Sequence, residues 1–455
     1  MGVAIVLIAA GCGGVGKSGA GGVQGGAPTA SATTAGLRVT YSRVALTIPS
    51  ANRGASLSGR RTLVLPQGWS AEVWARVPKA RLEAWAPGGD LLVSAPARGE
   101  VIELIPRANR SEPPGKRTLA SGLTNPQGLA FDRLDGHEVL YVAESDQLDR
   151  YAWVHGRLGA RAVVIGHLPD TGPAGSDVHR QKNVVVGADH TIYVDIGSAS
   201  NAIPQASLRG LPRASVIALR PNGSDVHVFA TGVRNGDGLA FAPDGALWTA
   251  VNERDDIAYP FHHPYEGPGD AFGRVIQTYV DEHPPDELAR LTDGRNVGWP
   301  FCNPDPDVDP GRAASSRDYA NMRFDRDAQT NPGGTRLDCA KLAPIDRGLP
   351  AHSAPLGFHF LQRSSLPSPW SSGAVVAVHG SWDRVPPRAP AVLWLPWESS
   401  ARTLAGAITL VGGFQDSSGA RWGRPVDAVP GPDGALYVSD DTAGAIYRIL
   451  PARHR

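Results

Sequence analysis

Several polar side chains stand just ahead of apolar runs in this sequence. They are Gln127 in LTNPQGLAF, Arg234 and Asn235 in ATGVRNGDGLAF, and Arg424 in RWGRPVDAVPGPDG, with His179 about ten residues before a turn. Imidazole, guanidinium and amide groups can exchange protons, hold anions and orient a ligand by hydrogen bonds. Any one of them could be a structural group, but their shared register predicts that they converge on one rim of the fold.

Other motifs of catalytic or metal sites are absent or incomplete. The chain has no G-x-S-x-G, H-E-x-x-H or paired C-x-x-C pattern, which removes support for ordinary serine hydrolases, zincins and zinc ribbons. The run GCGGVGKS (11–18) fits the phosphate-loop pattern, but the glycine-rich tract after it cannot form the required helix. The acidic run Asp305–Gly311 has Pro310 where a calcium loop needs Gly, so we interpret it as a solvated turn.

The N-terminal residues 1–36 are typical of an export segment. An apolar run at 3–10 is followed by small residues, Cys12 and a flexible tract, as in a lipoprotein signal with Cys12 lipidated or an ordinary secretory signal. No later run approaches 18 consecutive apolar residues, so membrane contact is expected only through such an anchor. We predict a periplasmic or cell-surface location.

Composition narrows the possible partners. The 455 residues carry 44 basic and 44 acidic side chains, which argues against nucleic acid. If Cys12 is lipidated or removed, the pair Cys302 and Cys339 remains, and in an exported protein we expect a disulfide, the alternative being two separate buried thiols.

A repeated unit of a turn followed by β-forming residues predicts the architecture. Its copies are PGGDLLVS (87–94), DGHEVLYVAE (135–144), ADHTIYVDIGS (188–198), PDGALWTAVN (243–252), SSGAVVAVHGS (371–381) and PDGALYVSDD (432–441). Six units predict an all-β, six-bladed β-propeller over residues 60–453, with a long insertion between the fourth and fifth units. The flanking stretches 65–81 and 443–450 suggest that the last blade combines strands from both ends of the chain.

Residues 60–453 resemble the glucose/sorbosone dehydrogenase family, soluble quinoproteins that bind pyrroloquinoline quinone (PQQ) in a six-bladed propeller. The matching stretches include TNPQGLAF, PPDELARLTDGRNVGWPFC, AHSAPLGF, AVVAVHGSWDR and WGRPVDAVPGPDGALYVSDD. The order of HSAPLG, HGSW and GRP followed by PDG and SDD is the most specific part, and it is most similar to the sorbosone dehydrogenase branch.

The resemblance implies roles for individual residues. His179 would be the general base for a substrate hydroxyl, and Arg234 would stabilise the oxyanion that develops on the quinone. Gln127 and Asn235 would position cofactor and substrate, while Arg424 and Arg384 would pair with cofactor carboxylates. The family also uses Ca²⁺, implied here to bind through backbone carbonyls near Asp286 and Glu287.

The sequence departs from the family pattern at three places. Arg234-Asn-Gly-Asp-Gly238 replaces Arg-Asn-Pro-x-Gly, Lys182 stands where others place Arg, and an insertion occupies residues 256–283. The predicted function is oxidation of a sugar, a sugar aldehyde or a related alcohol, with electrons passed to a soluble or membrane acceptor. The alternatives are a non-catalytic propeller that binds carbohydrate or protein, and a metal-dependent lactone hydrolase.

Overall fold

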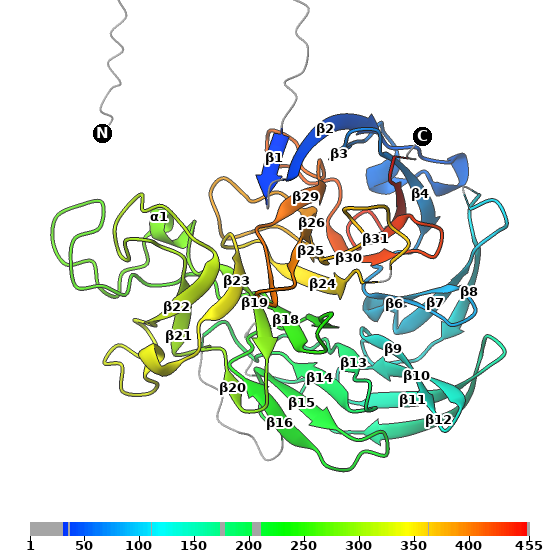
Figure 1. Cartoon of the computed structure of the whole chain (residues 1–455), viewed down its shortest axis with the longest axis horizontal. Helices are drawn as coiled ribbons and strands as arrows, with labels where there is room; N and C mark the ends of the chain where they lie inside the picture. Colours follow the sequence, from blue (N-terminus) through cyan, green and yellow to red (C-terminus); the bar gives the residue numbers. More distant parts are fainter. Residues whose placement is uncertain are drawn as a thin grey trace, which may run out of the picture.

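Six antiparallel sheets surround a common axis in the computed structural model, which describes residues 31–34, 37–110, 112–172, 178–202, 211–362 and 364–452 (Figure 1). Blade 1 contains β5 (Glu83–Trp85), β6 (Leu91–Ala95), β7 (Glu100–Ile105) and β8 (Gly115–Ala120); blade 2 contains β9 (Leu129–Leu134), β10 (His137–Ala143), β11 (Leu148–Val154) and β12 (Arg157–Ile165). Blade 3 contains β13 (Val184–Val186), β14 (Ile192–Ile196), β15 (Ser215–Leu219) and β16 (His227–Thr231), and β20 (Arg295–Asn296) extends it by pairing parallel with β16. Blade 4 contains β17 (Gly238–Phe241), β18 (Leu247–Val251), β19 (Asp286–Leu291) and β23 (Ile345–Leu349), extended by β22 (Ala320–Arg326) and β21 (Cys302–Asp305). Blade 5 contains β24 (Pro355–Phe360), β25 (Ala374–Val378), β26 (Ala391–Leu395) and β29 (Ile408–Val411). The predicted six-bladed propeller is confirmed.

Blade 6 closes the ring with strands from both ends of the propeller. It contains β30 (Pro425–Pro430), β31 (Leu436–Asp440) and β32 (Ala445–Leu450), and β32 pairs with β4 (Ser70–Arg76) in the order β30-β31-β32-β4. The prediction that flanking stretches share the last blade is therefore confirmed. This pairing joins residues about 370 positions apart, as in the contact Tyr447↔Val73.

The first strand of each blade lies at the hub. β5, β9, β13, β17, β24 and β30 contact one another in that order and back to β5. Residues from all six line a central cavity of about 420 Å³. The loops at the ends of this channel are therefore brought together from the whole length of the chain.

Turn residues and burial explain why each repeat forms a blade. In the Asp-Gly turns, Gly245 and Gly434 have φ of +82° and +78°, a conformation that a residue with a side chain adopts only at a cost. The strand after each turn is enclosed between neighbouring blades, so β6, β18, β25 and β31 are buried along their full length. This burial accounts for their nearly continuous apolar sequences.

A separate three-stranded sheet precedes the propeller. β1 (Ser31–Thr34), β2 (Leu37–Ala45) and β3 (Thr62–Pro66) pair in sequence order, and Leu63 and Leu65 pack into the core shared by blades 5 and 6. β1 falls within the tract predicted to be a linker. The rest of the predicted export segment, including Cys12, lies outside the described residues.

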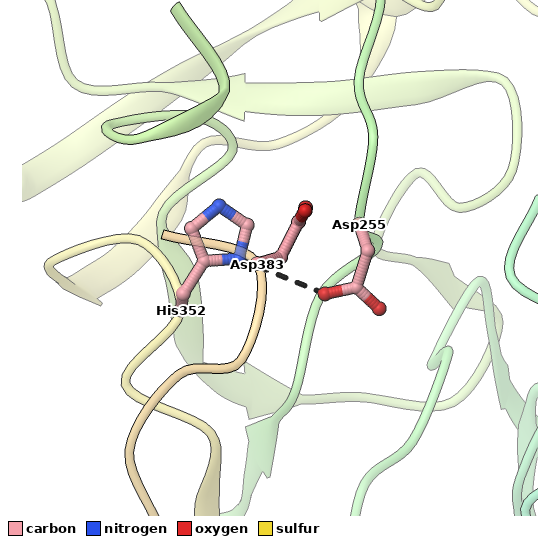
Figure 2. Close-up of side chains that lie close together, drawn as sticks. All are labelled: Asp255, His352 and Asp383. Atoms are coloured by element: carbon pink, nitrogen blue, oxygen red, sulfur yellow. Dashed lines mark ion pairs between the residues drawn. The ribbon is translucent and has the colours of Figure 1, made fainter. Parts of the chain in front are cut away.

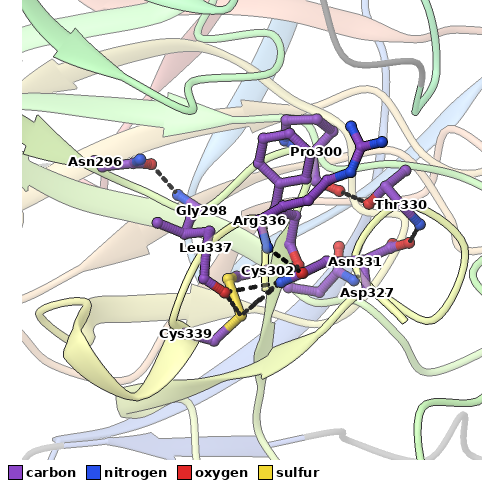
Figure 3. Close-up of a disulfide and its surroundings, with 12 residues drawn as sticks. Asn296, Gly298, Pro300, Cys302, Asp327, Thr330, Asn331, Arg336, Leu337 and Cys339 are labelled. Atoms are coloured by element: carbon purple, nitrogen blue, oxygen red, sulfur yellow. Dashed lines mark hydrogen bonds between the residues drawn. A yellow bond between two sulfur atoms is a disulfide. The ribbon is translucent and has the colours of Figure 1, made fainter. Parts of the chain in front are cut away.

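The long insertion lies inside blade 4. Residues 252–285, with the short helix α1 (Gln277–Val280), separate β18 from β19, and residues 292–344 separate β19 from β23. In the second segment, Cys302 and Cys339 form a disulfide with a Cα–Cα distance of 5.6 Å (Figure 3). Beside it, the Asn331 side-chain amide donates to the carbonyl of Leu337 at 2.8 Å.

A few short elements complete the described chain. They are β27 (Trp397–Glu398), β28 (Thr403–Leu404) and the 3₁₀ turns Ser50–Asn52, Ala55–Leu57, Pro96–Arg98 and Cys339–Lys341. In the part of the chain that is described, no helix combines the length and apolar character needed to cross a bilayer.

Candidate active site at the rim of the channel

The residues that precede the inner strands lie at one end of the channel. Gln127, Lys182 and Arg424 stand one or two positions before β9, β13 and β30, and Arg234 stands four positions before β17. Because all six inner strands run in the same direction along the hub, these residues share one rim. The structure therefore brings together side chains that are up to 297 positions apart in the sequence.

Ser198 orients the imidazole of His179. Nδ1 of His179 lies 3.0 Å from Oγ of Ser198, and that hydroxyl donates its own hydrogen to the carbonyl of Ser200 at 2.7 Å. A serine hydroxyl has one hydrogen, so here it can only accept from His179, and Nδ1 carries the ring proton. Nε2 is then the nitrogen that can accept a proton. Burial, together with the charge of Arg234, lowers the pKa of His179 to about 3, which keeps the ring neutral.

Arg234 is buried and held by the loop that contains Asn201. Its Nε donates to the Asn201 carbonyl at 3.2 Å, and its Nη2 donates to Asn201 Oδ1 at 2.9 Å. Trp299, in the GWP motif, donates from Nε1 to the same carbonyl at 2.9 Å. Asp255 lies 3.4 Å from Nη2 and forms an ion pair with Arg234. The guanidinium is thus fixed in place before any ligand binds.

The loop after β14 joins His179 to Arg234. The Ser198 carbonyl accepts from the backbone N–H of His179 at 3.0 Å, and the Ser198 N–H donates to the Arg234 carbonyl at 2.7 Å. A Cβ at Gly197 would lie 2.5 Å from His179 Cβ and 3.2 Å from Asn235 Oδ1. Close packing through glycine therefore sets the positions of His179, Arg234 and Asn235 relative to one another.

Crowding also accounts for the missing proline of the Arg-Asn-Pro-x-Gly pattern. A Cβ at Gly236 would lie 2.5 Å from Val233 Cγ1 and 2.8 Å from Thr249 Oγ1. In this chain the residue after Asn235 is therefore limited to glycine unless its neighbours move.

A second polar network crosses the rim through Gln127. Its amide nitrogen donates to Asp237 Oδ1 at 2.9 Å, and its Oε1 accepts from Arg81 at 3.2 Å. Arg81 also forms ion pairs with Asp237 at 3.4 Å and with Asp441 at 3.3 Å. Gln127 is fully buried with both ends of its amide engaged, so it positions its neighbours.

His379 extends this network to Arg424. His379 Nε2 lies 3.1 Å from Asp441 Oδ1, and Arg424 donates to the carbonyls of His379 and Gly380 at 2.8 and 3.0 Å. Burial lowers the pKa of His379 to about 4, even though Asp441 opposes the shift. The pKa of Asp441 is lowered by His379 and Arg81 in spite of its burial.

Lys182 and Arg424 are cations near carboxylates: against the larger effect of burial, Asp195 acts to raise the pKa of Lys182 and Asp441 that of Arg424. Lys182 is fully buried and donates to the carbonyl of Arg180 at 2.7 Å. No carboxylate among the described residues lies within ion-pair distance of Lys182 or Arg424. Burial lowers the pKa of Lys182 to about 8 and also lowers that of Arg424. Buried cations without a paired carboxylate favour an anionic ligand.

Two carboxylates and an imidazole meet in Figure 2, and one of the carboxylates, Asp255, is the ion-pair partner of Arg234. One ligand atom from each of Asp255, His352 and Asp383 lies within 4.8 Å of the others. Nε2 of His352 is 2.6 Å from the carbonyl of Val280, which places a proton on Nε2, and Nδ1 faces Asp255 Oδ1 at 3.7 Å. These side chains could hold a divalent cation.

Asp286 positions two of the three loops that carry this cluster, those of Asp255 and His352. Its Oδ1 accepts from the N–H of Glu253 and its Oδ2 from the N–H of Ala354, each at 2.8 Å. Glu287 is fully buried in β19, beside Val251. Calcium binding through backbone carbonyls near Asp286 and Glu287 stays a prediction, and the side-chain oxygens of Asp255 and Asp383 are additional oxygen ligands that converge here.

The structure does not bring Arg384 together with the other predicted residues. Its guanidinium donates to Glu282 at 2.7 Å and to the carbonyls of Asp281 and Pro386. It therefore fastens the insertion of blade 4 to the loop after β25. Its neighbour Asp383 is the residue of that loop that reaches the Asp255 cluster.

Several residues of the site share a position in the repeat that the sequence prediction did not use. Ser198, Asn252, His379 and Asp441 each follow the second strand of a blade within two positions. Since the first two strands of a blade are antiparallel, the end of the second lies beside the start of the first. Polar residues after a second strand thus reach the same rim as those before a first strand.

Comparisons with known proteins agree with this fold. The family model described as TrAA12-like matches residues 63–452. An uncharacterized protein of Borreliella burgdorferi is 24% identical over 400 residues, covering 85% of this chain and 90% of that protein.

Solved structures show the same architecture. The holo PQQ domain of pyranose dehydrogenase from Coprinopsis cinerea is 19% identical, with 89% of this chain and 100% of that chain covered and a TM-score of 0.67. A calcium structure of a carbohydrate-active enzyme of family AA12 from Trichoderma reesei is 19% identical, with coverage of 85% and 96% and a TM-score of 0.67. The PQQ-bound aldose sugar dehydrogenase of Streptomyces coelicolor is 16% identical, with coverage of 85% and 99% and a TM-score of 0.51.

Proposed function

Because the chain belongs to the TrAA12-like family, we propose that it is a PQQ- and Ca²⁺-dependent dehydrogenase of a sugar, a sugar aldehyde such as sorbosone, or a related alcohol. The observation that carries this proposal is that the loop after β14 holds a neutral imidazole and a fixed guanidinium from two other loops, through Ser198. A base and a preorganised positive charge side by side are what oxidation of a hydroxyl group requires.

His179 is the proposed general base. Removal of a carbon-bound hydrogen together with its electron pair from an alcohol or hydrate leaves the hydroxyl proton to be accepted, and Nε2 of His179 accepts it. Nδ1 keeps its proton because Ser198 holds it. The chemistry that the quinone supplies when bound is acceptance of the electron pair and its hydrogen. The guanidinium of Arg234 supports negative charge beside the reacting atoms.

The rim has groups that fit a polycarboxylate quinone and its metal. Lys182 and Arg424 would hold carboxylates, since neither forms an ion pair with a carboxylate of the described residues. Asp255 and Asp383 would bind Ca²⁺ through oxygen, the ligand atom that this ion prefers. Asp286 and Gln127 would act through the groups that they position. The electron acceptor is a soluble or membrane carrier, and export with a lipid anchor at Cys12 would place the reaction at the cell surface.

The test is reconstitution of the purified chain with PQQ and Ca²⁺. We expect a change in quinone absorbance on binding, and dye reduction with at least one member of a panel of aldoses and sorbosone. His179→Ala should lower kcat/KM by about 10²- to 10⁴-fold, the usual contribution of a general base. His227→Ala, which changes an exposed histidine of the same blade, is the matched control.

Two results would overturn the proposal. Sugar binding with neither quinone binding nor dye reduction would identify a carbohydrate-binding propeller. Calcium-dependent opening of a lactone without quinone would identify a hydrolase.

A further inference from the structure

The first segment of the blade 4 insertion, residues 252–285, covers one face of the β21–β22 hairpin, which belongs to the second segment. Asn303 pairs with Asp325 across this hairpin, and Asp305 lies two positions along β21, so Asp305 and Asp325 share a face. Phe324 points to the other face and packs in the core of blade 4. The segment that ends in His283 lies over the acidic face.

His283 presents an unbonded nitrogen to this face. Its side chain is 3% exposed and stacks on Tyr279 with the ring centroids 4.1 Å apart. Nδ1 donates to the carbonyl of Tyr279 at 3.0 Å, so Nε2 is the free ring nitrogen. Nε2 lies within ion-pair distance of two carboxylates, 3.4 Å from Asp307 Oδ2 and 3.7 Å from Asp305 Oδ1, but neither contact has the geometry of a hydrogen bond.

The facing carboxylates are also buried and incompletely bonded. The side chains of Asp305 and Asp307 are 7% and 3% exposed. Asp305 Oδ2, Asp307 Oδ1 and Asp325 Oδ2 lack hydrogen bonds within the described part of the chain, and Arg317 forms only a long ion pair with Asp307, 3.6 Å from Nε to Oδ1. The interpretation of this acidic run as a solvated turn is therefore wrong for Asp305 and Asp307.

Buried polar atoms without partners are costly, and here they converge from separate segments. We propose that His283, Asp305 and Asp307 bind one divalent transition-metal ion of the Zn²⁺ type, with Asp325 beside them. Their ligand atoms lie within 4.8 Å of one another. Two tetrahedral ligands with bonds of about 2.0–2.2 Å stand roughly 3.3–3.6 Å apart, close to the observed 3.4 and 3.7 Å.

The surroundings of the ligands fit this assignment. A histidine that binds a metal through one nitrogen usually donates from the other to a carbonyl, as His283 does to Tyr279. One imidazole with carboxylates suits Zn²⁺ better than Ca²⁺, which prefers oxygen ligands throughout. A cavity of about 740 Å³ lined by Asp305, Asp307 and Asp325 gives an ion access. The ion would fasten residues 252–285 of the insertion to the β21–β22 hairpin.

The experiment measures Zn²⁺ binding by the chelator-treated full chain in excess Ca²⁺, by metal analysis and calorimetry. We expect one Zn²⁺ per chain. His283→Gln and Asp307→Asn should weaken binding by more than about 100-fold, since loss of an outer-shell partner alone costs 10- to 100-fold. His262→Gln is the matched control, because His262 lies in the same insertion, is exposed and pairs with Asp270. It should bind Zn²⁺ normally.

Zn²⁺ binding is measured without any sugar oxidation. The variant His352→Gln shows whether the Zn²⁺ is bound instead by the cluster of Asp255, His352 and Asp383. If His352→Gln still binds Zn²⁺, the site at His283 is supported. If His352→Gln no longer binds Zn²⁺, the proposal is overturned. Unchanged binding in folded His283→Gln, or no binding by the wild-type chain, overturns it too. If the His283 and Asp307 variants do not fold, zinc-edge absorption of His352→Gln decides: one imidazole with carboxylate oxygens supports the site, and a spectrum without imidazole refutes it.

Discussion

Nδ1 of His179 lies 3.0 Å from Oγ of Ser198, whose own hydrogen is donated to the carbonyl of Ser200. One hydroxyl therefore decides which nitrogen of the imidazole is basic. Ser198 comes from the end of β14 and His179 from the loop before β13, so their contact is formed by the first hairpin of blade 3.

Replacement of Ser198 by alanine tests this relationship. Without the acceptor, the proton is no longer confined to Nδ1, and we expect kcat to fall by about 10- to 100-fold, part of the contribution of a general base. KM should change little, because the change is not in a group that binds substrate. Steady-state kinetics of the reconstituted chain measure both. Ser215→Ala removes another buried hydroxyl of blade 3, bonded to Pro212, and should keep wild-type kcat.

Gly197→Ala should disturb the site through packing alone. The new Cβ would lie 2.5 Å from His179 Cβ and 3.1 Å from the His179 carbonyl oxygen, so the loop that carries His179 has to shift. We expect a loss of activity of at least about 100-fold, as for small displacements of catalytic groups. The comparison is Gly88→Ala, where no atom lies within 4 Å of the new Cβ. Equal activity of the two variants would contradict the packing argument.

The pH dependence of stability should report on His379. Its pKa is about 4 in the folded chain and about 6.5 when unfolded, so below pH 6.5 the unfolded chain binds a proton that the native state does not. The stability that comes from keeping His379 neutral is fully present above pH 6.5 and is lost as the pH falls toward 4. Between pH 7 and pH 5 this amounts to about 2 kcal/mol.

Urea unfolding of wild type and His379→Gln at both pH values isolates this effect. We expect the free energy of unfolding of the wild type to fall by about 2 kcal/mol more than that of the variant. Other histidines titrate in both proteins and cancel in the difference. The opposite sign, with the variant losing more stability in acid, would show that His379 is protonated in the native state.

The disulfide should contribute to stability by closing the loop between Cys302 and Cys339. For the sequence separation of 37, chain entropy predicts about 4 kcal/mol. The double variant Cys302→Ala, Cys339→Ala should lose that amount in urea unfolding under oxidising conditions. Under strong reductant the wild type should approach the double variant. If reductant leaves the stability of the wild type unchanged while the double variant is destabilised, the lower free energy of unfolding of the variant comes from core packing and not from the disulfide.

Local pattern was sufficient for the repeating architecture. Turns of Gly, Asp or Ser residues, such as the Asp-Gly turn at Gly434, each followed by a short β-forming run, identify a blade hairpin without knowledge of the rest of the chain. Six such hairpins leave a ring as the arrangement that buries both faces of every sheet. The register of Gln127, Arg234 and Arg424 ahead of inner strands follows from the same local signals.

Only the tertiary structure determines the contacts across the ring and across the insertion. No local signal distinguishes Arg424, which stays at the hub, from Arg384, which pairs with Glu282. Nor does the acidic run at Asp305 reveal that His283 covers it. Turns and strands depend on neighbours within a few residues, which the sequence determines by itself. Charge pairing and metal binding depend on which distant segments share a buried space, and that is settled only when the blades close and pack.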